Sequence, residues 1–328
     1  MTWWDRIRRT GSEDWFFTHL PLTPDDPGRA TPVKADSAYL SAHLVSMHVS
    51  DQRAGTRRIH ASVTSRVSLQ SRTGENVEFV TLVTPEAIRG ARPGTLDRIV
   101  LMDKRILGPV PYRGGDVELQ VGLFAIPTTD LLEPYLGLVE EITKYVGVGY
   151  LAVPRMLVAT AQAALNTLLG APDGPSLEIG LVASLSDPVP GYYCVVRASR
   201  DDPSLRHLAI AEDRRLVRPD GSAVQFPYLV VGVTAATRRD DWAGSPELQG
   251  AYEAVREAVK DGDLVRAEQA LAMFGRVAVF SPDLLAEDGR RLRDLVRDQV
   301  HLVFPATATS GGARKGSLPE LVDLPLFG

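Results

Sequence analysis

Much of the chain between residues 30 and 127 alternates apolar and polar side chains with the two-residue period of a β-strand. Glycine and proline turns separate the alternating runs. The strands expected from this pattern cover residues 38–49, 56–69, 77–83, 98–102 and 116–126. Several short strands at this spacing predict an antiparallel β-sandwich. The glycine- and proline-rich residues 107–115 are expected to form a tight corner between two of them.

A helical period replaces the alternation in the next part of the chain. Asp130 and Glu133 have the spacing of a capping box, and apolar side chains then recur every three or four residues. Residues 146–169 are the most apolar part of the sequence, with Arg155 as their only charged residue. A second helix is expected over residues 155–169, so this region predicts a helix pair.

A second β region is expected over residues 177–236. Its first strands cover residues 177–185 and 192–198. A hairpin should follow, because Asp220-Gly221 is a common two-residue turn between strands. Its strands are expected near residues 214–217 and 224–233.

Three helices are expected after this β region. The first two cover residues 245–261 and 264–279, and the third begins at Ser281. Ser245 and Ser281 each precede a proline, which suits an N-cap followed by the first helical turn. Residues 262–271 resemble one tetratricopeptide helix pair, but no second copy of the repeat is found, so a single helical hairpin is expected.

These elements predict an α+β fold. It comprises an N-terminal antiparallel β-sandwich with a helix pair, followed by a second β unit closed by a three-helix C-terminal region. A chain of 328 residues is long enough for two domains. The expected segments are an aromatic N-terminal segment and linker (1–28), the β-sandwich with its helices (29–170), an α+β domain ending in three helices (171–304), and a flexible linker with an apolar C-terminal peptide (305–328).

The composition and charge of the chain give further evidence on its class and its location in the cell. Hydrophobic residues make up 44% and charged residues 23%, as in ordinary globular domains. A net charge of -5 gives no general attraction to nucleic acid. The basic residues are mostly arginine, which favours a bacterial source with a GC-rich genome. The single cysteine, Cys194, excludes a disulfide within the chain, and the N-terminus lacks a signal-peptide pattern, so a cytoplasmic location is expected.

No catalytic, cofactor or metal site is predicted. Residues 147–152 match the dinucleotide fingerprint GxGxxA, but a helix rather than a strand is expected before them. The histidines lack zinc spacing, and His43 and His48 would point to opposite faces of one strand. Cys194 lies in an apolar strand, with His207 as the one base that can be named for it. Aspartates near the first sheet are dispersed, so a sandwich of the C2-like, membrane-docking type is expected to make protein contacts without calcium.

Apolar side chains gather at both ends of the chain. The predicted partner-binding residues are Trp3, Trp4, Trp15 and Phe16 near the N-terminus and Leu321, Leu324, Leu326 and Phe327 near the C-terminus. The aromatic cluster has three readings: it packs on the fold, anchors a partner, or lies at a membrane surface. The C-terminal peptide either folds back as an extra strand or docks on another subunit, and its flexible linker suits both.

The sequence favours a non-enzymatic adaptor, scaffold or assembly component of a bacterial multi-protein system, for example one that acts in conflict or defence. Its partners would be proteins or further copies of the chain, and not nucleic acid. Two alternatives stay open. One is a membrane-active effector released by a switch or by proteolysis, suggested by residues 146–169 and the aromatic N-terminus. The other is a hydrolase with an unrecognised site, for which Cys194 and His207 are the only nameable pair.

Overall fold

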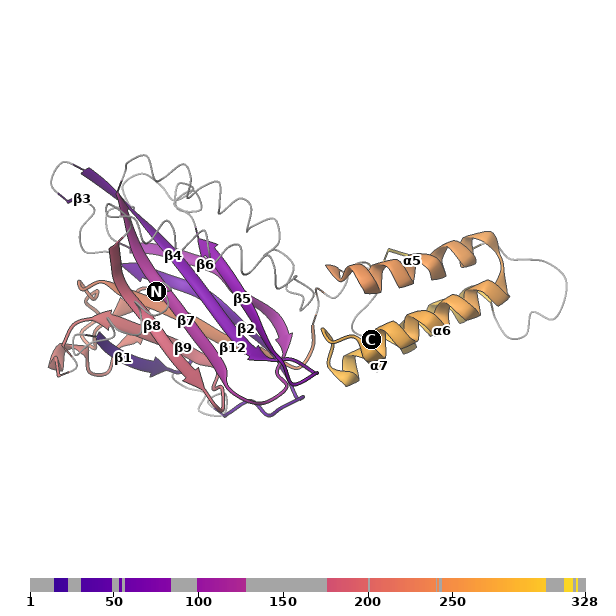
Figure 1. Ribbon diagram of the computed structural model, residues 1–328, viewed down its shortest axis with the longest axis horizontal. Coiled ribbons are helices and arrows are strands. Elements are labelled where there is room, and N and C mark those ends of the chain that lie inside the picture. The colour runs from indigo at the N-terminus through magenta and orange to yellow at the C-terminus, as the bar shows by residue number, and fades with distance from the viewer. Residues whose placement is uncertain are drawn as a thin grey trace. The chain divides into compact units, whose positions relative to one another are not determined.

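The contacts of the chain divide it into two compact units. The structure is a computed structural model that describes residues 15–22, 31–48, 53–54, 57–83, 99–127, 176–199, 201–239, 241, 244–304, 316–320 and 323. The first unit, the β unit, comprises residues 1–34, 40–108 and 112–235; the second, the helical unit, comprises residues 35–39, 109–111 and 236–328. Figure 1 draws the labelled strands and the three C-terminal helices.

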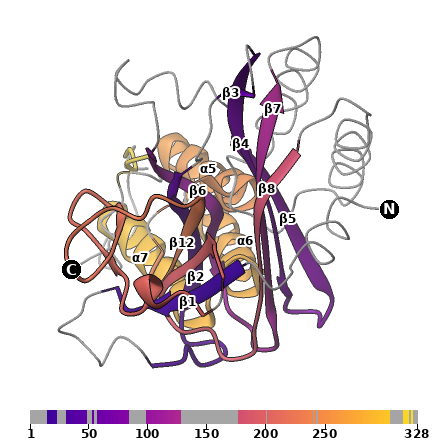
Figure 2. The same cartoon turned by 90° about the vertical axis from the view of Figure 1, so that its left-hand side faces the viewer.

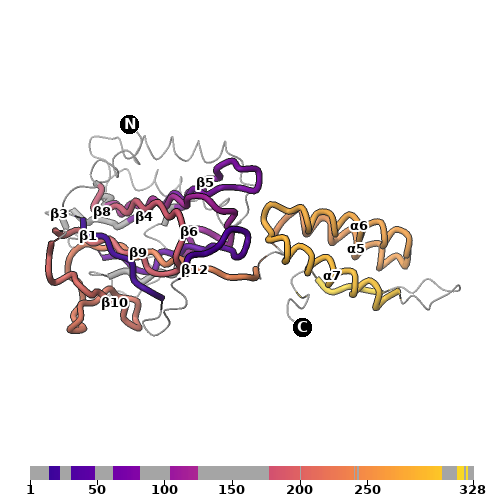
Figure 3. The backbone as a smooth tube through the Cα atoms, turned by 90° about the horizontal axis from the view of Figure 1, so that it is seen from below, coloured from indigo at the N-terminus to yellow at the C-terminus, as the bar shows by residue number. Residues whose placement is uncertain are grey.

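Two five-stranded sheets build the β unit, and Figure 3 shows them as separate layers. The first sheet has the order β1 (Trp15–Leu20), β9 (Gly191–Arg197), β12 (Tyr228–Ala236), β2 (Tyr39–His48) and β6 (Ile99–Pro111). The second has the order β3 (Arg53–Ala54), β4 (Arg57–Gln70), β7 (Val117–Pro127) and β8 (Ser176–Leu185), with β5 (Asn76–Val83) also paired to β4. A short ribbon of β10 (Ala209–Ile210) and β11 (Leu216–Val217) and a 3-10 helix, η2 (Pro203–Leu205), lie between β9 and β12 in the chain.

Strand β4 organises the second sheet. It pairs antiparallel with β5 and with β7, so that Val63 faces Val83 on one side and Leu123 on the other. Val63, Val67 and Leu69 are buried, and so are Thr64 and Ser68 on the opposite face of the strand. The alternation in the sequence therefore predicted the strand, but both of its faces are covered.

The α+β class predicted from the sequence is confirmed, because antiparallel sheets precede three helices near the C-terminus. The strands expected at residues 38–49, 56–69, 77–83 and 116–126 correspond to β2, β4, β5 and β7, and those of the second β region to β8 and β9. The expected helix pair at residues 130–169 lies outside the described residues.

The two predicted β regions share both sheets. Strand β8 pairs with β7, and β9 and β12 lie in the same sheet as β2. Contacts therefore divide the chain near residue 235 and not near residue 170. The physical reason is that an unpaired edge of β7 would leave its backbone groups without partners, and β8 supplies them.

The structure contains two of the predicted turns. The corner expected over residues 107–115 is confined to residues 112–116, where Gly114 and Gly115 have positive φ angles, because residues 107–111 continue strand β6. Pro109 and Pro111 are tolerated in that strand because β6 is the edge strand of its sheet. The Asp220-Gly221 turn exists, since the Gly221 amide donates to the Arg218 carbonyl at 2.9 Å. Antiparallel pairing on the two sides of this turn forms a short hairpin, with a bridge between Val217 and Ala223 and the Val224 amide donating to the Leu216 carbonyl at 3.1 Å. The later strand β12 pairs with β9 instead of with β11.

The helical unit contains α5 (Pro246–Asp261), α6 (Leu264–Phe280) and α7 (Ala286–Val303). Gly262 ends α5 in the left-handed conformation, at a φ of 77°, and the Asp263 side chain accepts from the Arg266 amide to begin α6. Ser281 ends α6 and does not begin α7; the N-cap of α7 is Leu285. The helical hairpin predicted around residues 262–271 is confirmed.

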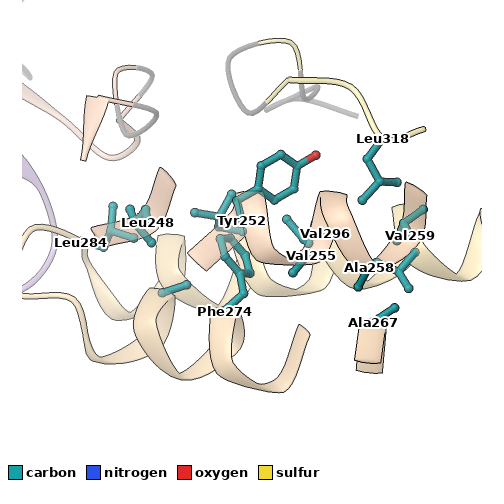
Figure 4. Close-up of a cluster of buried hydrophobic side chains, with 13 residues drawn as sticks. Leu248, Tyr252, Val255, Ala258, Val259, Ala267, Phe274, Leu284, Val296 and Leu318 are labelled. Carbon is teal, nitrogen blue, oxygen red and sulfur yellow. The ribbon is translucent and has the colours of Figure 1, made fainter. Parts of the chain in front are cut away.

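One apolar core holds the three helices together. Tyr252 and Phe274 meet at its centre with ring centroids 5.9 Å apart, as the close-up in Figure 4 shows. Val296 from α7 and Leu318 from the C-terminal segment complete the same cluster. The helical unit therefore buries a residue that follows α7 by fifteen positions, so the segment around Leu318 belongs to its fold.

Candidate functional site

The partner-binding residues predicted near the N-terminus fall partly on strand β1. Trp15 and Phe16 lie in β1, opposite Arg197 and Val196 of β9, and both are half-buried. Phe16 packs against the apolar cluster around Tyr228. Figure 2 shows β1 with its neighbouring strands. Part of the aromatic surface that the sequence predicted for partner binding is therefore packed within the β unit.

The other predicted partner-binding residues lie outside the described residues. These are Trp3, Trp4, Leu321, Leu324, Leu326 and Phe327. Their role in binding stays a prediction. The structure does describe residues 316–320, which form no strand and pack on the helical unit through Leu318. The start of the C-terminal peptide thus folds back on its own chain and packs on the helices instead of adding a strand.

Cys194 and His207 do not form a nucleophile and base. The Cys194 side chain is fully buried in β9, and burial raises the pKa of its thiol far above the usual range. Its Sγ lies 3.8 Å from the carbonyl oxygen of Tyr192. His207 is exposed, in a turn with a φ of 58°. A thiol in this environment stays protonated and behaves as a small core side chain.

Two histidines of the β unit, His19 and His48, pack beside aromatic rings. His48 is buried, with Nδ1 at 2.8 Å from the carbonyl oxygen of Phe226 and its ring 5.6 Å from that of Tyr228. His19 packs on Tyr193 at 4.6 Å between ring centroids, and burial lowers its pKa. Among the residues that the structure describes, no group of three or more histidine, cysteine, aspartate or glutamate side chains is placed to hold a metal ion.

A groove of about 440 Å³ runs between α6 and α7. Its apolar lining comes from one helix, and consists of Leu271, Ala272, Gly275, Val279 and Phe280. Its charged lining consists of Glu268 and Arg276 on α6 and Arg293 and Arg297 on α7. The helices approach closely there, because a Cβ added at Gly275 would lie 3.0 Å from Cγ of Arg293. The arginine stem covers the glycine, and the guanidinium reaches the rim.

Apolar side chains continue from the groove across the outer side of α6. Val265, Met273 and Phe280 are 66%, 53% and 67% exposed. Met273 and Phe280 are two helical turns apart, so they share one side of the helix. A helix that is apolar beyond the face it buries in its own core indicates a surface that contacts another molecule. We call Val265, Met273, Phe280 and the groove residues the α6 surface.

The arginines of the α6 surface differ in their pairing. Arg293 Nη2 lies 2.9 Å from Asp294 Oδ1, and Arg297 Nη1 lies 3.1 Å from the same oxygen. Within the described residues, Arg276 makes no ion pair. One acidic residue, Glu268, stands against three arginines in the lining of the groove. Asp294 and Asp298 oppose Arg293 and Arg297, so among the described residues Arg276 is the lining arginine best suited to pair with a carboxylate of a ligand.

Sequence reasoning missed the α6 surface because it followed one apolar face of the helix. That face contains Ala267 and Phe274, which are buried as expected. The available signal was the low charge of the whole helix: only Arg266, Glu268 and Arg276 are charged among 17 residues. Such a composition exceeds what a single buried stripe requires.

No helix in the described part of the chain is both long and apolar enough to span a membrane. In comparisons with known proteins, no family model, no curated protein and no solved structure matches the chain. Among the surfaces of the described residues, the α6 surface is the strongest candidate for a binding site.

Proposed function

We propose that this chain is a non-catalytic adaptor or scaffold that binds another protein through the α6 surface. The observation that carries the proposal is the exposure of Met273 and Phe280 beside a groove with an apolar floor. Large apolar and aromatic side chains that border arginines are typical of the residues that dominate binding energy at protein interfaces.

The chemistry of the surface favours an amphipathic helix with acidic flanks as the bound segment. A partner helix would place apolar side chains along the groove at three- and four-residue spacing, against Leu271 and Val279. Its carboxylates would face Arg276, Arg293 and Arg297 on the rim. Arginine suits this role because its planar guanidinium pairs with a carboxylate through two hydrogen bonds.

The expected affinity is moderate. Complete burial of a large apolar side chain contributes roughly 1.5–3 kcal/mol, and Val265, Met273 and Phe280 are already a third to a half buried, so together they contribute about 3–6 kcal/mol. Association costs about 4 kcal/mol or more in lost freedom of motion. The difference between these two energies suits a partner that dissociates and is exchanged, as adaptors require. The groove and its arginines supply the rest of the affinity.

The termini supply further contacts in this proposal. Trp3, Trp4 and the apolar residues 321–327 are retained as predicted partner-binding positions. A chain that lacks residues 305–328 tests the C-terminal group by size-exclusion chromatography and partner capture. Unchanged mass and unchanged capture would count against a role for this peptide in binding.

Differential capture tests the α6 surface. The double variant Met273→Ser with Phe280→Ser removes the exposed apolar side chains and leaves the helix core intact. Leu302→Ser is the matched control, because Leu302 is 75% exposed on α7 and does not line the groove. Proteins captured from a lysate of the source cells are quantified by mass spectrometry for the wild type and both variants.

The proposal expects at least one protein that the wild type and Leu302→Ser capture equally and the double variant loses about tenfold or more, which corresponds to 1.4 kcal/mol or more. Equal capture of every protein by all three chains would contradict it. Circular dichroism of the three chains checks that the helices are intact.

A further inference from the structure

The segment of residues 316–320 occupies a defined place on the helical unit. After the end of α7 at Val303, the chain returns and buries Leu318 among apolar side chains of the helices. Leu318 is 5% exposed, although its neighbours Ser317 and Glu320 are exposed. Figure 4 shows Leu318 beside Val259 at one end of the cluster. We call residues 316–320 the strap and the surface beneath it the slot.

Three contacts define how the slot holds the strap. The Leu318 side chain fills an apolar position between α5 and α7. The hydroxyl of Tyr252 donates to the carbonyl oxygen of Pro319 at 3.1 Å. Gly316 lies so close to α7 that an added Cβ would sit 2.4 Å from Cγ1 of Val303. Recognition thus combines one side-chain pocket, one main-chain hydrogen bond and one position where only glycine fits.

A charge on the slot complements the strap. Arg256 on α5 donates through Nη1 to both carboxylate oxygens of Glu253, at 2.7 and 3.0 Å. The hydrogen bond that Arg256 donates to Glu253 raises the pKa of Arg256, and the negative charge of Glu320 also favours the charged form of Arg256. Arg256 therefore lies within electrostatic reach of the acidic residue that follows Pro319.

We propose that the slot is a recognition site for an extended Leu-Pro-acidic segment of a partner protein, and that the strap is its tethered occupant. A partner segment of this chemistry binds when the strap leaves. The slot residues Tyr252 and Val303 do not line the groove, so binding at the slot can be tested separately from the α6 surface. The strap is a peptide ligand already seated in the site, which identifies the chemistry that the site accepts.

The tether explains why so few contacts hold the strap. Residues 305–315 join α7 to the strap, so strap docking is intramolecular, with an effective concentration on the order of millimolar. One buried leucine and one hydrogen bond suffice under that condition. A partner in trans competes against the tether, so an intact strap raises the partner concentration needed for binding.

Fluorescence anisotropy with a labelled peptide of residues 316–323 tests the proposal. Two full-length variants weaken the binding of the strap to the slot. Leu318→Ala removes the buried leucine side chain, and Gly316→Ala adds a methyl group that would contact Val303. Ser317→Ala is the matched control, since Ser317 is exposed. Circular dichroism and thermal unfolding confirm that each chain is folded.

The peptide is expected to bind both strap variants, and to bind the wild type and Ser317→Ala at least about tenfold more weakly. Replacing the peptide leucine that corresponds to Leu318 by alanine should abolish binding. Tyr252→Phe in the Leu318→Ala chain should weaken it several-fold, because the hydroxyl no longer donates to the proline carbonyl. Two results would overturn the proposal: no binding to either folded strap variant, or binding that the alanine peptide reproduces.

Discussion

At the residue scale, Arg239 is the most completely buried charged side chain among the described residues. Its Nε donates to Asp241 Oδ1 at 2.6 Å and its Nη1 to the carbonyl oxygen of Asp283 at 3.2 Å. Its backbone amide faces Asp288 Oδ2 at 3.3 Å. The start of α7 is also bonded to Tyr39. The Tyr39 hydroxyl accepts a hydrogen bond from the Leu285 amide at 2.8 Å, which satisfies a backbone donor at the start of this helix.

Replacing Arg239 is expected to destabilise the helical unit. Arg239→Met keeps much of the packing but removes the donors to Asp241 and Asp283, at a cost of about 1–3 kcal/mol. Asp241 is partly exposed and can be hydrated, which keeps the cost below that of a fully buried pair. Urea unfolding followed by circular dichroism measures it. Arg238→Met at the exposed neighbour is the control, with an expected change within about 0.5 kcal/mol; equal effects of both variants would contradict the assignment.

The stability of the helical unit should also depend on Tyr252 at alkaline pH. Burial raises the pKa of its hydroxyl to about 12, above the usual value of 10.0. In the unfolded chain the hydroxyl loses its proton first, so the stabilising difference is fully present below pH 10 and is lost as the pH rises from 10 towards 12. Unfolding of the wild type and Tyr252→Phe is compared across this range. The wild type should lose more stability than the variant; parallel curves would show that Tyr252 contributes nothing.

At the element scale, two helical glycines should respond to alanine in opposite ways. A Cβ at Gly289 of α7 would lie 2.4 Å from the carbonyl oxygen of Ala278 on α6, whereas Gly250 of α5 has nothing within 4 Å. Gly250→Ala should therefore stabilise the unit by about 0.5–1 kcal/mol through helix propensity. Gly289→Ala should destabilise it by about 1–3 kcal/mol, because α6 and α7 must move apart. Thermal unfolding measures both; a stabilising Gly289→Ala would contradict the close helix contact.

The sequence predicted which segments form helices and strands better than it predicted where these elements end or which strands pair. Alternation located β4 and β7, and turn residues located the break between α5 and α6. It could not predict that β6 continues through Pro109 and Pro111, because proline is tolerated only on an edge, and the edge depends on the order of strands in the sheet. It also placed the start of α7 at Ser281, since a serine before a proline resembles a cap even where the preceding helix ends there.

At the scale of the whole molecule, the pairing of strands determines which β regions share a sheet, and local sequence patterns do not predict this pairing. The two β regions looked like separate domains, but β7 pairs with β8 and β2 shares a sheet with β9 and β12. Such pairings join residues far apart in the chain and leave no periodic signal. The strap was partly foreseen, because an apolar peptide after a linker indicates docking. Its site on the helices was not, since it depends on the gap that Leu318 fills.

Site-specific photocrosslinking in the source cells tests the proposal that this chain binds its partner through the α6 surface. A photoreactive amino acid replaces Met273 on the α6 surface or Leu302 on α7, both more than half exposed. If the partner binds the α6 surface, position 273 yields a discrete crosslinked species of higher mass and position 302 yields none. No crosslinked species from position 273, or the same species from both positions, would contradict it.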